Sequence, residues 1–130
     1  MSTVSLTLDE IFDLAKKTLL ANGCDDETAS ILSDLIRNAE RDGSLSHGLF
    51  RLPAYVSGLK SGKINGKGKP EIQKVSTSVI KVKGNNCLAP VVLSKGLPEL
   101  AKAAKENGVA VLAINNSHHM AAMWPETEKL

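Results

Sequence analysis

The 130-residue sequence contains few cysteines and few aromatic residues. Its two cysteines, Cys24 and Cys87, lie far apart and match no metal-ligand spacing, and secreted chains of this size usually carry more of them. We therefore expect two reduced thiols. The N-terminal segment lacks the basic and apolar stretches of a secretory signal, and no apolar run approaches membrane-spanning length. By elimination, the sequence predicts a cytoplasmic protein.

The sequence also lacks a strong excess of either charge, because 16 basic residues stand against 14 acidic ones. The basic segment 60–69 interleaves its lysines with glycine and asparagine, where a nucleic-acid-binding surface would place aromatic side chains. We interpret this segment as a solvated loop and expect no nucleic-acid partner. What the sequence does contain is a hydrophobic content of 42%, which is enough for one buried core.

Start signals and apolar spacing predict two helices in the first third of the chain. Thr7 and Glu10 form a capping box, and the helix behind them should end at Gly23, since glycine can adopt the left-handed conformation that closes a helix. Asp25 or Asp26 should cap the second helix. The apolar positions expected on one face of these helices are Ile11, Leu14, Ala15, Leu19, Ala29, Leu32, Leu35, Ile36 and Ala39.

Residues 40–48 break this spacing with two glycines and two serines, and we interpret them as a loop. A third helix should begin at about Gly48, with Pro53 near its first turn, where a missing N–H does little harm. The apolar positions expected on this helix are Leu49, Leu52, Tyr55, Val56 and Leu59.

The second half of the sequence alternates strand and helix patterns. Clustered β-branched residues predict strands over 71–75 and 78–83, and the continuous apolar run 109–114 predicts a strand buried on both faces. A helix over 89–107 should precede that run, with a break or kink caused by its internal glycine and proline. Such a strand needs neighbours on both edges, so we expect the sheet to be only begun here.

The predicted fold class is therefore α/β, with an N-terminal helical segment followed by the beginning of an α/β domain that is incomplete in this chain. We place the helical segment at residues 1–66 and the start of the α/β domain at residues 67–130. No Gly-x-Gly-x-x-Gly turn occurs, so a Rossmann dinucleotide site is not supported.

All three histidines lie in two predicted loops. His118 and His119 follow the last predicted strand, where open α/β sheets usually bind ligands, but no carboxylate or thiol completes a metal site there, and we expect none. Ser46 beside His47 could form a nucleophile and its base, although adjacent residues rarely achieve that geometry and no Gly-x-Ser-x-Gly elbow is present. His47 fits better as a general acid. An ordinary surface histidine is the alternative.

Arg51 lies four residues after His47, so on a helix that begins at Gly48 the two side chains would project from about the same face. A guanidinium there can bind a substrate carboxylate bidentately, while the imidazole reaches the oxygen or nitrogen on the adjacent carbon. The alternative is a solvated arginine at a helix start.

Two segments resemble hallmarks of one enzyme family. Residues 42–55, which read Asp-Gly-Ser-Leu-Ser-His-Gly-Leu-Phe-Arg-Leu-Pro-Ala-Tyr, resemble the type-2 malate/L-lactate dehydrogenase family. Residues 116–126 are similar to a segment of its Δ1-piperideine-2-carboxylate/Δ1-pyrroline-2-carboxylate reductase branch. The resemblance implies a homodimeric oxidoreductase with a non-Rossmann α/β cofactor domain. It also implies that NADPH or NADH supplies hydride to a C=N or C=O carbon beside a carboxylate.

The resemblance further implies roles for individual residues. His47 matches the proton donor of the family, Ser46 its relay partner and Arg51 its ligand for the substrate carboxylate. The implied substrates are Δ1-piperideine-2-carboxylate, Δ1-pyrroline-2-carboxylate or a 2-oxo acid such as oxaloacetate or pyruvate. The family segment that contacts the cofactor is matched by His119, Met120, Ala121, Ala122 and Met123.

Members of this family are much longer, so the rest of the cofactor region and the aspartate of the relay are expected beyond Leu130. We therefore expect a fragment with little activity of its own. The alternative is a non-catalytic dimerisation or interaction module derived from the same family, in which exposed apolar surface favours self-association or a partner.

Overall fold

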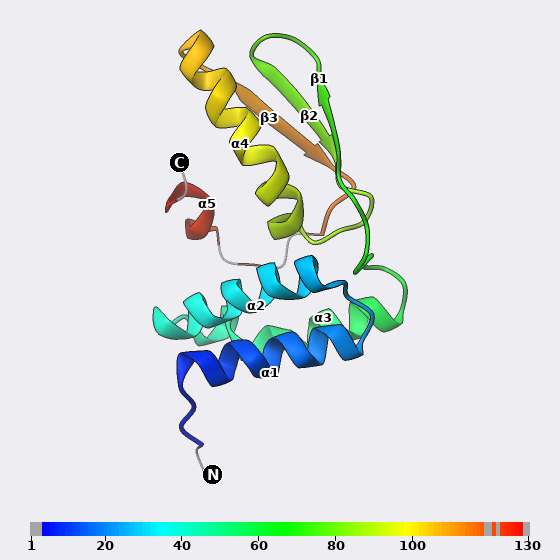
Figure 1. Cartoon of the computed structure of the whole chain (residues 1–130), viewed down its shortest axis with the longest axis vertical. Helices are drawn as coiled ribbons and strands as arrows, with labels where there is room; N and C mark the ends of the chain where they lie inside the picture. The colour runs from blue at the N-terminus through cyan, green and yellow to red at the C-terminus, as the bar shows by residue number, and fades with distance from the viewer. Residues whose placement is uncertain (1–3, 119–120, 122, 129–130) are drawn as a thin grey trace.

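The computed structural model describes residues 4–118, 121 and 123–128. Three helices, α1 (Leu8–Ala21), α2 (Asp26–Arg41) and α3 (Leu52–Lys60), lie together on one side of the molecule (Figure 1). Two single 3-10 turns, η1 (Leu45–His47) and η2 (Leu49–Arg51), join α2 to α3. We call α1, α2, α3 and these two turns the helical lobe.

A second lobe, which we call the sheet lobe, consists of three strands and α4 (Ala89–Asn107). The strands are β1 (Glu71–Lys74), β2 (Val79–Lys83) and β3 (Val111–Asn115), and a short helix α5 (Trp124–Glu128) comes after them. Figure 1 shows the sheet lobe on the opposite side of α2 from α1, with α4 in front of the strands.

Local features of the sequence fix both ends of α1 and the start of α2. The Thr7 hydroxyl accepts the Glu10 N–H, and the Glu10 carboxylate accepts the Thr7 N–H at 2.7 Å, which confirms the predicted capping box. Gly23 follows the end of α1 with φ +99°, as a helix-closing glycine should. Of the two candidate caps for α2, it is Asp25 whose side chain accepts the Thr28 N–H, at 2.9 Å.

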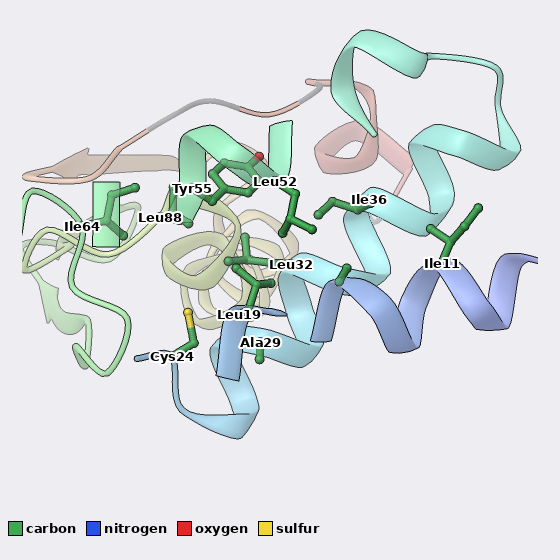
Figure 2. Packing of buried hydrophobic residues seen from close by; sticks show 11 residues of the cluster. Ile11, Leu19, Cys24, Ala29, Leu32, Ile36, Leu52, Tyr55, Ile64 and Leu88 are labelled. Atoms are coloured by element: carbon green, nitrogen blue, oxygen red, sulfur yellow. The ribbon is translucent and has the colours of Figure 1, made fainter. Parts of the chain in front are cut away.

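The core of the helical lobe lies where the three helices meet (Figure 2). Leu19, Leu32 and Ile36 are fully buried, and Tyr55 from α3 is 1% exposed. Burying one such side chain stabilises the fold by about 1.5–3 kcal/mol. The prediction was wrong for Leu14, which is 46% exposed because it lies at a groove between α1 and α3 instead of in the core.

The sheet has the order β1-β2-β3, with β1 antiparallel and β3 parallel to β2. The parallel pair places Ile80 opposite Leu112, and α4 forms the crossover between the two strands. Ile80 and Val82 are buried against α4, whereas Lys81 and Lys83, which point to the other face, are exposed. This sheet is thus covered on one face, and the α/β fold class is confirmed.

The structure corrects two predictions about the sheet lobe. The strand in the run 109–114 is not buried on both faces, because only one face of the sheet packs against α4 and Val111 on the other face is 55% exposed. The predicted break in the helix over 89–107 does not occur, since α4 continues through Gly96 and Pro98 to Asn107, and the alternative of a kink stays a prediction.

The lysine-rich segment links the two lobes and is more ordered than a solvated loop. Its lysines are exposed, but Ile64 is 6% exposed and the Gly66 carbonyl accepts the Asp25 N–H at 2.9 Å. The boundary that we place after residue 66 stays a prediction. None of the helices in the described residues is long and apolar enough to cross a membrane.

Candidate functional site

The predicted loop over residues 40–48 is compact and largely hydrogen-bonded. α2 extends to Arg41, and η1 and η2 then follow each other with Gly48 between them. The Gly48 N–H donates to the Leu45 carbonyl, and the Arg51 N–H donates to the Gly48 carbonyl. Gly48 therefore does not begin the third helix, which starts at Leu52. The prediction that His47 and Arg51 share one face of a single helix is therefore wrong, because the two residues end separate turns.

Two serine hydroxyls surround one nitrogen of the His47 ring. Ser46 Oγ lies 3.0 Å from His47 Nδ1, and Ser44 Oγ lies 3.3 Å from the same atom. Adjacent residues thus do reach hydrogen-bonding distance here, contrary to our expectation. Within the described residues, Nε2 has no hydrogen-bond partner. It is therefore the ring nitrogen that is available to a ligand.

Trp124 brings the second sequence segment to His47. The two rings meet edge to face, with their centroids 5.8 Å apart. A hydrogen bond from Trp124 also reaches Asp42, whose pKa is lowered mainly by its hydrogen bonds with Arg41 and further by this one. The indole consequently forms one wall of the His47 environment and ties α5 to the end of α2.

Arg51 carries an unsatisfied buried donor. Its Nε atom is buried and has no hydrogen-bond partner in the described structure. A buried N–H without an acceptor costs about 1–3 kcal/mol, so the position favours a ligand that brings an acceptor. The charge of Arg51 also acts on Tyr55, where burial raises the pKa of the phenol and the guanidinium opposes that rise. A carboxylate is the ligand that matches such a guanidinium.

The segment after β3 is described only in part. His118 is half-buried and held by its backbone, since its N–H donates to the Cys87 carbonyl and its carbonyl accepts the Ala89 N–H. Met123 is 73% exposed and Ala121 is half-buried. The other residues predicted to contact a cofactor, namely His119, Met120 and Ala122, lie outside the described residues.

Sequence reasoning did not identify three side chains that shape this site: Glu40, Ser44 and Trp124. Ser44 lies three residues before His47, a spacing that brings the two together in one turn. Trp124 belongs to the second hallmark segment but is too far from His47 in sequence for spacing to connect them. Glu40 accepts the Leu49 N–H across the loop. No group of three or more metal-ligating side chains occurs in the described part of the chain, and the absence of a metal stays a prediction.

Comparison with known proteins gives this geometry a family context. A family described as malate/L-lactate dehydrogenase matches residues 6–130. A Pseudomonas syringae pv. tomato protein named Delta(1)-pyrroline-2-carboxylate/Delta(1)-piperideine-2-carboxylate reductase is 37% identical over 97% of this chain and 37% of its own length. A malate/(S)-sulfolactate dehydrogenase from Methanothermus fervidus is 40% identical over 85% of this chain and 33% of its own length.

A solved structure supports the same relationship. The crystal structure of delta1-piperideine-2-carboxylate reductase from the same Pseudomonas matches 98% of this chain and 38% of that protein, with a TM-score of 0.93 and 37% identity. The chain thus spans little more than a third of the length of the relatives it matches. Because the family match includes almost every residue, both hallmark segments among them, the chain belongs to the malate/L-lactate dehydrogenase family.

Proposed function

We propose that this chain supplies the proton-donating and carboxylate-binding part of an active site that reduces a C=N or C=O bond beside a carboxylate. The expected substrates are Δ1-pyrroline-2-carboxylate, Δ1-piperideine-2-carboxylate or a small 2-oxo acid. The observation that carries the proposal is the buried, unpartnered Nε of Arg51, which ends the turn that follows His47. The names of the relatives, which are reductases and dehydrogenases of such acids, support it.

The chemistry follows from the hydrogen bonds of the imidazole. In its protonated form the ring donates Nδ1–H to the serine oxygens, which leaves Nε2–H for the substrate. When hydride adds to the C2 carbon, the π electrons move onto the substrate nitrogen or oxygen, and that atom takes the proton from Nε2. His47 then remains neutral with its proton on Nδ1. Arg51 holds the carboxylate so that the reacting bond lies toward the imidazole.

A nicotinamide dinucleotide, NADH or NADPH, would supply the hydride when bound. Among the described residues of the predicted cofactor segment, Met123 has an exposed apolar side chain that would pack against the planar nicotinamide ring. Met123 directly precedes Trp124, whose ring contacts His47. Ala121, with His119, Met120 and Ala122, would complete this part of the cofactor contact.

A binding experiment on the 130-residue chain tests the substrate half of the proposal. We would follow backbone amide resonances during titration with pyrrole-2-carboxylate, a planar analogue that cannot be reduced at a C=N bond. We expect shifts at His47 and Arg51, and we expect pyrrole-2-carboxamide to bind at least about tenfold more weakly because it lacks the charge. Equal binding of the two compounds, or no binding of either, would contradict the proposal.

Matched arginine variants make this test specific. Arg51→Ala should weaken the binding of pyrrole-2-carboxylate about tenfold or more, and Arg51→Lys should restore only part of it, because an ammonium cannot form the bidentate pair. Arg37→Ala is the control, since Arg37 pairs with Asp34 on α2 and lies over the Phe12 ring. It should leave the affinity unchanged.

Turnover tests the proton donor. NAD(P)H oxidation with Δ1-pyrroline-2-carboxylate should be weak for this chain, because it spans 37% of the length of its reductase relative. Whatever rate the wild-type chain gives, His47→Ala should lower it about 10²–10⁴-fold, as expected for the loss of a general acid. An unchanged rate would rule out His47 as the donor.

The second candidate is a dimerisation module, and a specific surface favours it. Leu14, Leu49, Leu52 and Pro53 line an almost entirely apolar groove between α1 and α3, and Phe50, which follows Leu49 in the chain, is 75% exposed. Such a patch favours self-association, as the expected homodimer would require. Sedimentation of the wild type and Phe50→Ser separates the candidates. A Phe50-dependent dimer that does not bind pyrrole-2-carboxylate would favour the module over the enzyme.

A further inference from the structure

Glu40 forms the link between α2 and the turns that carry His47 and Arg51. It is the second-last residue of α2, and its Oε1 atom accepts the Leu49 N–H at 2.7 Å. A carboxylate at the C-terminal end of a helix is electrostatically unfavourable for that helix, because the unpaired carbonyls there are negative. The position of Glu40 therefore needs a reason outside α2, and the bond to Leu49 provides one.

Gly48 receives the Glu40 side chain directly against its backbone. A Cβ atom at Gly48 would lie 2.1 Å from Glu40 Oε1 and 2.5 Å from Cδ, far closer than real Cβ atoms approach another heavy atom. Only glycine leaves room for the carboxylate in this position. Gly48 also separates η1, which ends at His47, from η2, which ends at Arg51. The Glu40 side chain is thus seated at the joint between the two turns.

We propose that Glu40 is a positioning residue for the active site. Its carboxylate, seated on Gly48 and bonded to the Leu49 N–H, fixes how the turn of His47 lies relative to the turn of Arg51. A hydrogen bond to an ionised acceptor is about twice as strong as a neutral one, so it can hold a short loop that has few other long-range bonds. The roles of His47 and Arg51 rest on the proposed function, whereas the link itself does not.

Substitutions of Glu40 test the proposal in the 130-residue chain. Glu40→Ala should weaken the binding of pyrrole-2-carboxylate about tenfold, because the carboxylate ligand is no longer held in place. Glu40→Gln should restore most of the affinity, since its amide oxygen can still accept the Leu49 N–H. A Gln variant as weak as the Ala variant would overturn the proposal.

Glu106 provides a matched control. It is the second-last residue of α4, it is exposed, and its side chain forms no hydrogen bond or ion pair with another described residue. Glu106→Ala therefore removes a glutamate from the same helix position without touching the loop. We expect its affinity for pyrrole-2-carboxylate to equal that of the wild type, and a loss as large as that of Glu40→Ala would overturn the proposal.

A double-mutant cycle tests the contact with Gly48. Gly48→Ala should weaken binding about as much as Glu40→Ala, because the new Cβ displaces the carboxylate. In the Glu40→Ala background the atoms that would meet this Cβ are gone, so Gly48→Ala should add little. The two effects should therefore be strongly non-additive. Additive effects would contradict the proposed contact.

Hydrogen exchange separates this proposal from the proposed function, because it needs no ligand. The Leu49 amide should exchange faster in Glu40→Ala and in Gly48→Ala, and at nearly the wild-type rate in Glu40→Gln. If the wild type does not bind pyrrole-2-carboxylate, the proposed function fails while these rates still decide the role of Glu40. Unchanged exchange at Leu49 in both Glu40→Ala and Gly48→Ala would overturn the positioning role, whatever the chain binds.

Discussion

The helical lobe and the sheet lobe differ in how their cores are enclosed. In the helical lobe, Ala15, Leu19 and Leu32 are entirely buried in a core to which all three helices contribute. In the sheet lobe, one face of the sheet packs against α4, while the edge strand β3 leaves Val111 55% exposed. The residues 44–51 that we assign to the chemistry belong to the lobe whose core is enclosed by three helices.

This difference indicates that the two lobes have different roles. The turns that hold Ser46, His47 and Arg51 need a rigid support, because a catalytic geometry loses its effect when its parts shift by about an ångström. The helical lobe supplies that support through its core and through Glu40. In the sheet lobe, by contrast, the edge of β3 and the face of the sheet opposite α4 are uncovered in the described part of the chain. Because three helices enclose its core, we expect the helical lobe to be the more stable of the two.

The largest effect on the free energy of unfolding should come from truncating a core leucine to alanine in each lobe. Leu32→Ala should lower the free energy of unfolding by about 2–5 kcal/mol, since Leu32 is fully buried. Leu112→Ala should cost less, because Leu112 is only half-buried between β3 and α4. Val111→Ala, on the exposed side of the same strand, is the control and should stay within about 0.5 kcal/mol. Urea unfolding measures all three, and a larger loss for Leu112→Ala than for Leu32→Ala would reverse the comparison.

The two buried cysteines report the opening of each lobe separately. Burial raises the pKa of Cys24 to about 11, with the charge of Asp25 adding to the effect, and burial likewise raises the pKa of Cys87. Because the thiolate is the reactive form, both should react slowly with a disulfide reagent in the native chain. With increasing urea, Cys87 in the sheet lobe should be labelled before Cys24. Simultaneous labelling would show that the lobes unfold as one unit.

Short-range signals explain why the starts of α1 and α2 could be predicted from the sequence. Both depend on bonds between residues three apart, Thr7 with Glu10 and Asp25 with Thr28. The burial of β3 could not be predicted in this way, because it depends on what packs against each face of the sheet. An apolar run such as 109–114 does not encode that packing.

The candidate site shows the same limit. Its members in residues 44–51 are close in sequence, and the family resemblance pointed to three of them. The contacts that hold the site are longer in range: Glu40 reaches Leu49 across the loop, and Trp124 reaches His47 from the far end of the chain. Tertiary packing alone determines such pairs. The same packing replaced the predicted helix start at Gly48 with two separate turns.

A smaller effect should follow from removing the N-terminal cap of the helical lobe. Thr7→Ala should lower the free energy of unfolding by about 1 kcal/mol, because the Glu10 N–H loses its acceptor at the start of α1. Thr77→Ala, in the exposed hairpin of the sheet lobe, is the matched control and should change it by less than about 0.5 kcal/mol. Labelling of Cys24 should shift to lower urea in Thr7→Ala. A shift confined to Cys87 would mean that α1 stabilises the other lobe instead.

The smallest effect concerns the ion pairs that connect the lobes. On α2, Glu27 Oε2 lies 3.3 Å from Lys69 Nζ, and the Glu27 carboxylate also contacts Lys95 on α4. The hydrogen bond with Lys95, and to a smaller extent the one with Lys69, lowers the pKa of Glu27. A lowered folded-state pKa stabilises the fold above the usual carboxyl pKa of about 4.3, and this stabilisation is lost as the pH falls through the folded value. Glu27→Gln should therefore be slightly less stable than the wild type at neutral pH and equally stable at strongly acidic pH.

Salt and cysteine labelling show whether these pairs act between the lobes. The side chains of Glu27, Lys69 and Lys95 are all at least 42% exposed, so added salt should remove most of the small difference at neutral pH. If the ion pairs couple the lobes, Glu27→Gln should also widen the gap between the urea concentrations at which Cys87 and Cys24 are labelled. A stability difference that persists in acid and in salt would instead assign the contribution of Glu27 to packing between α2 and α4.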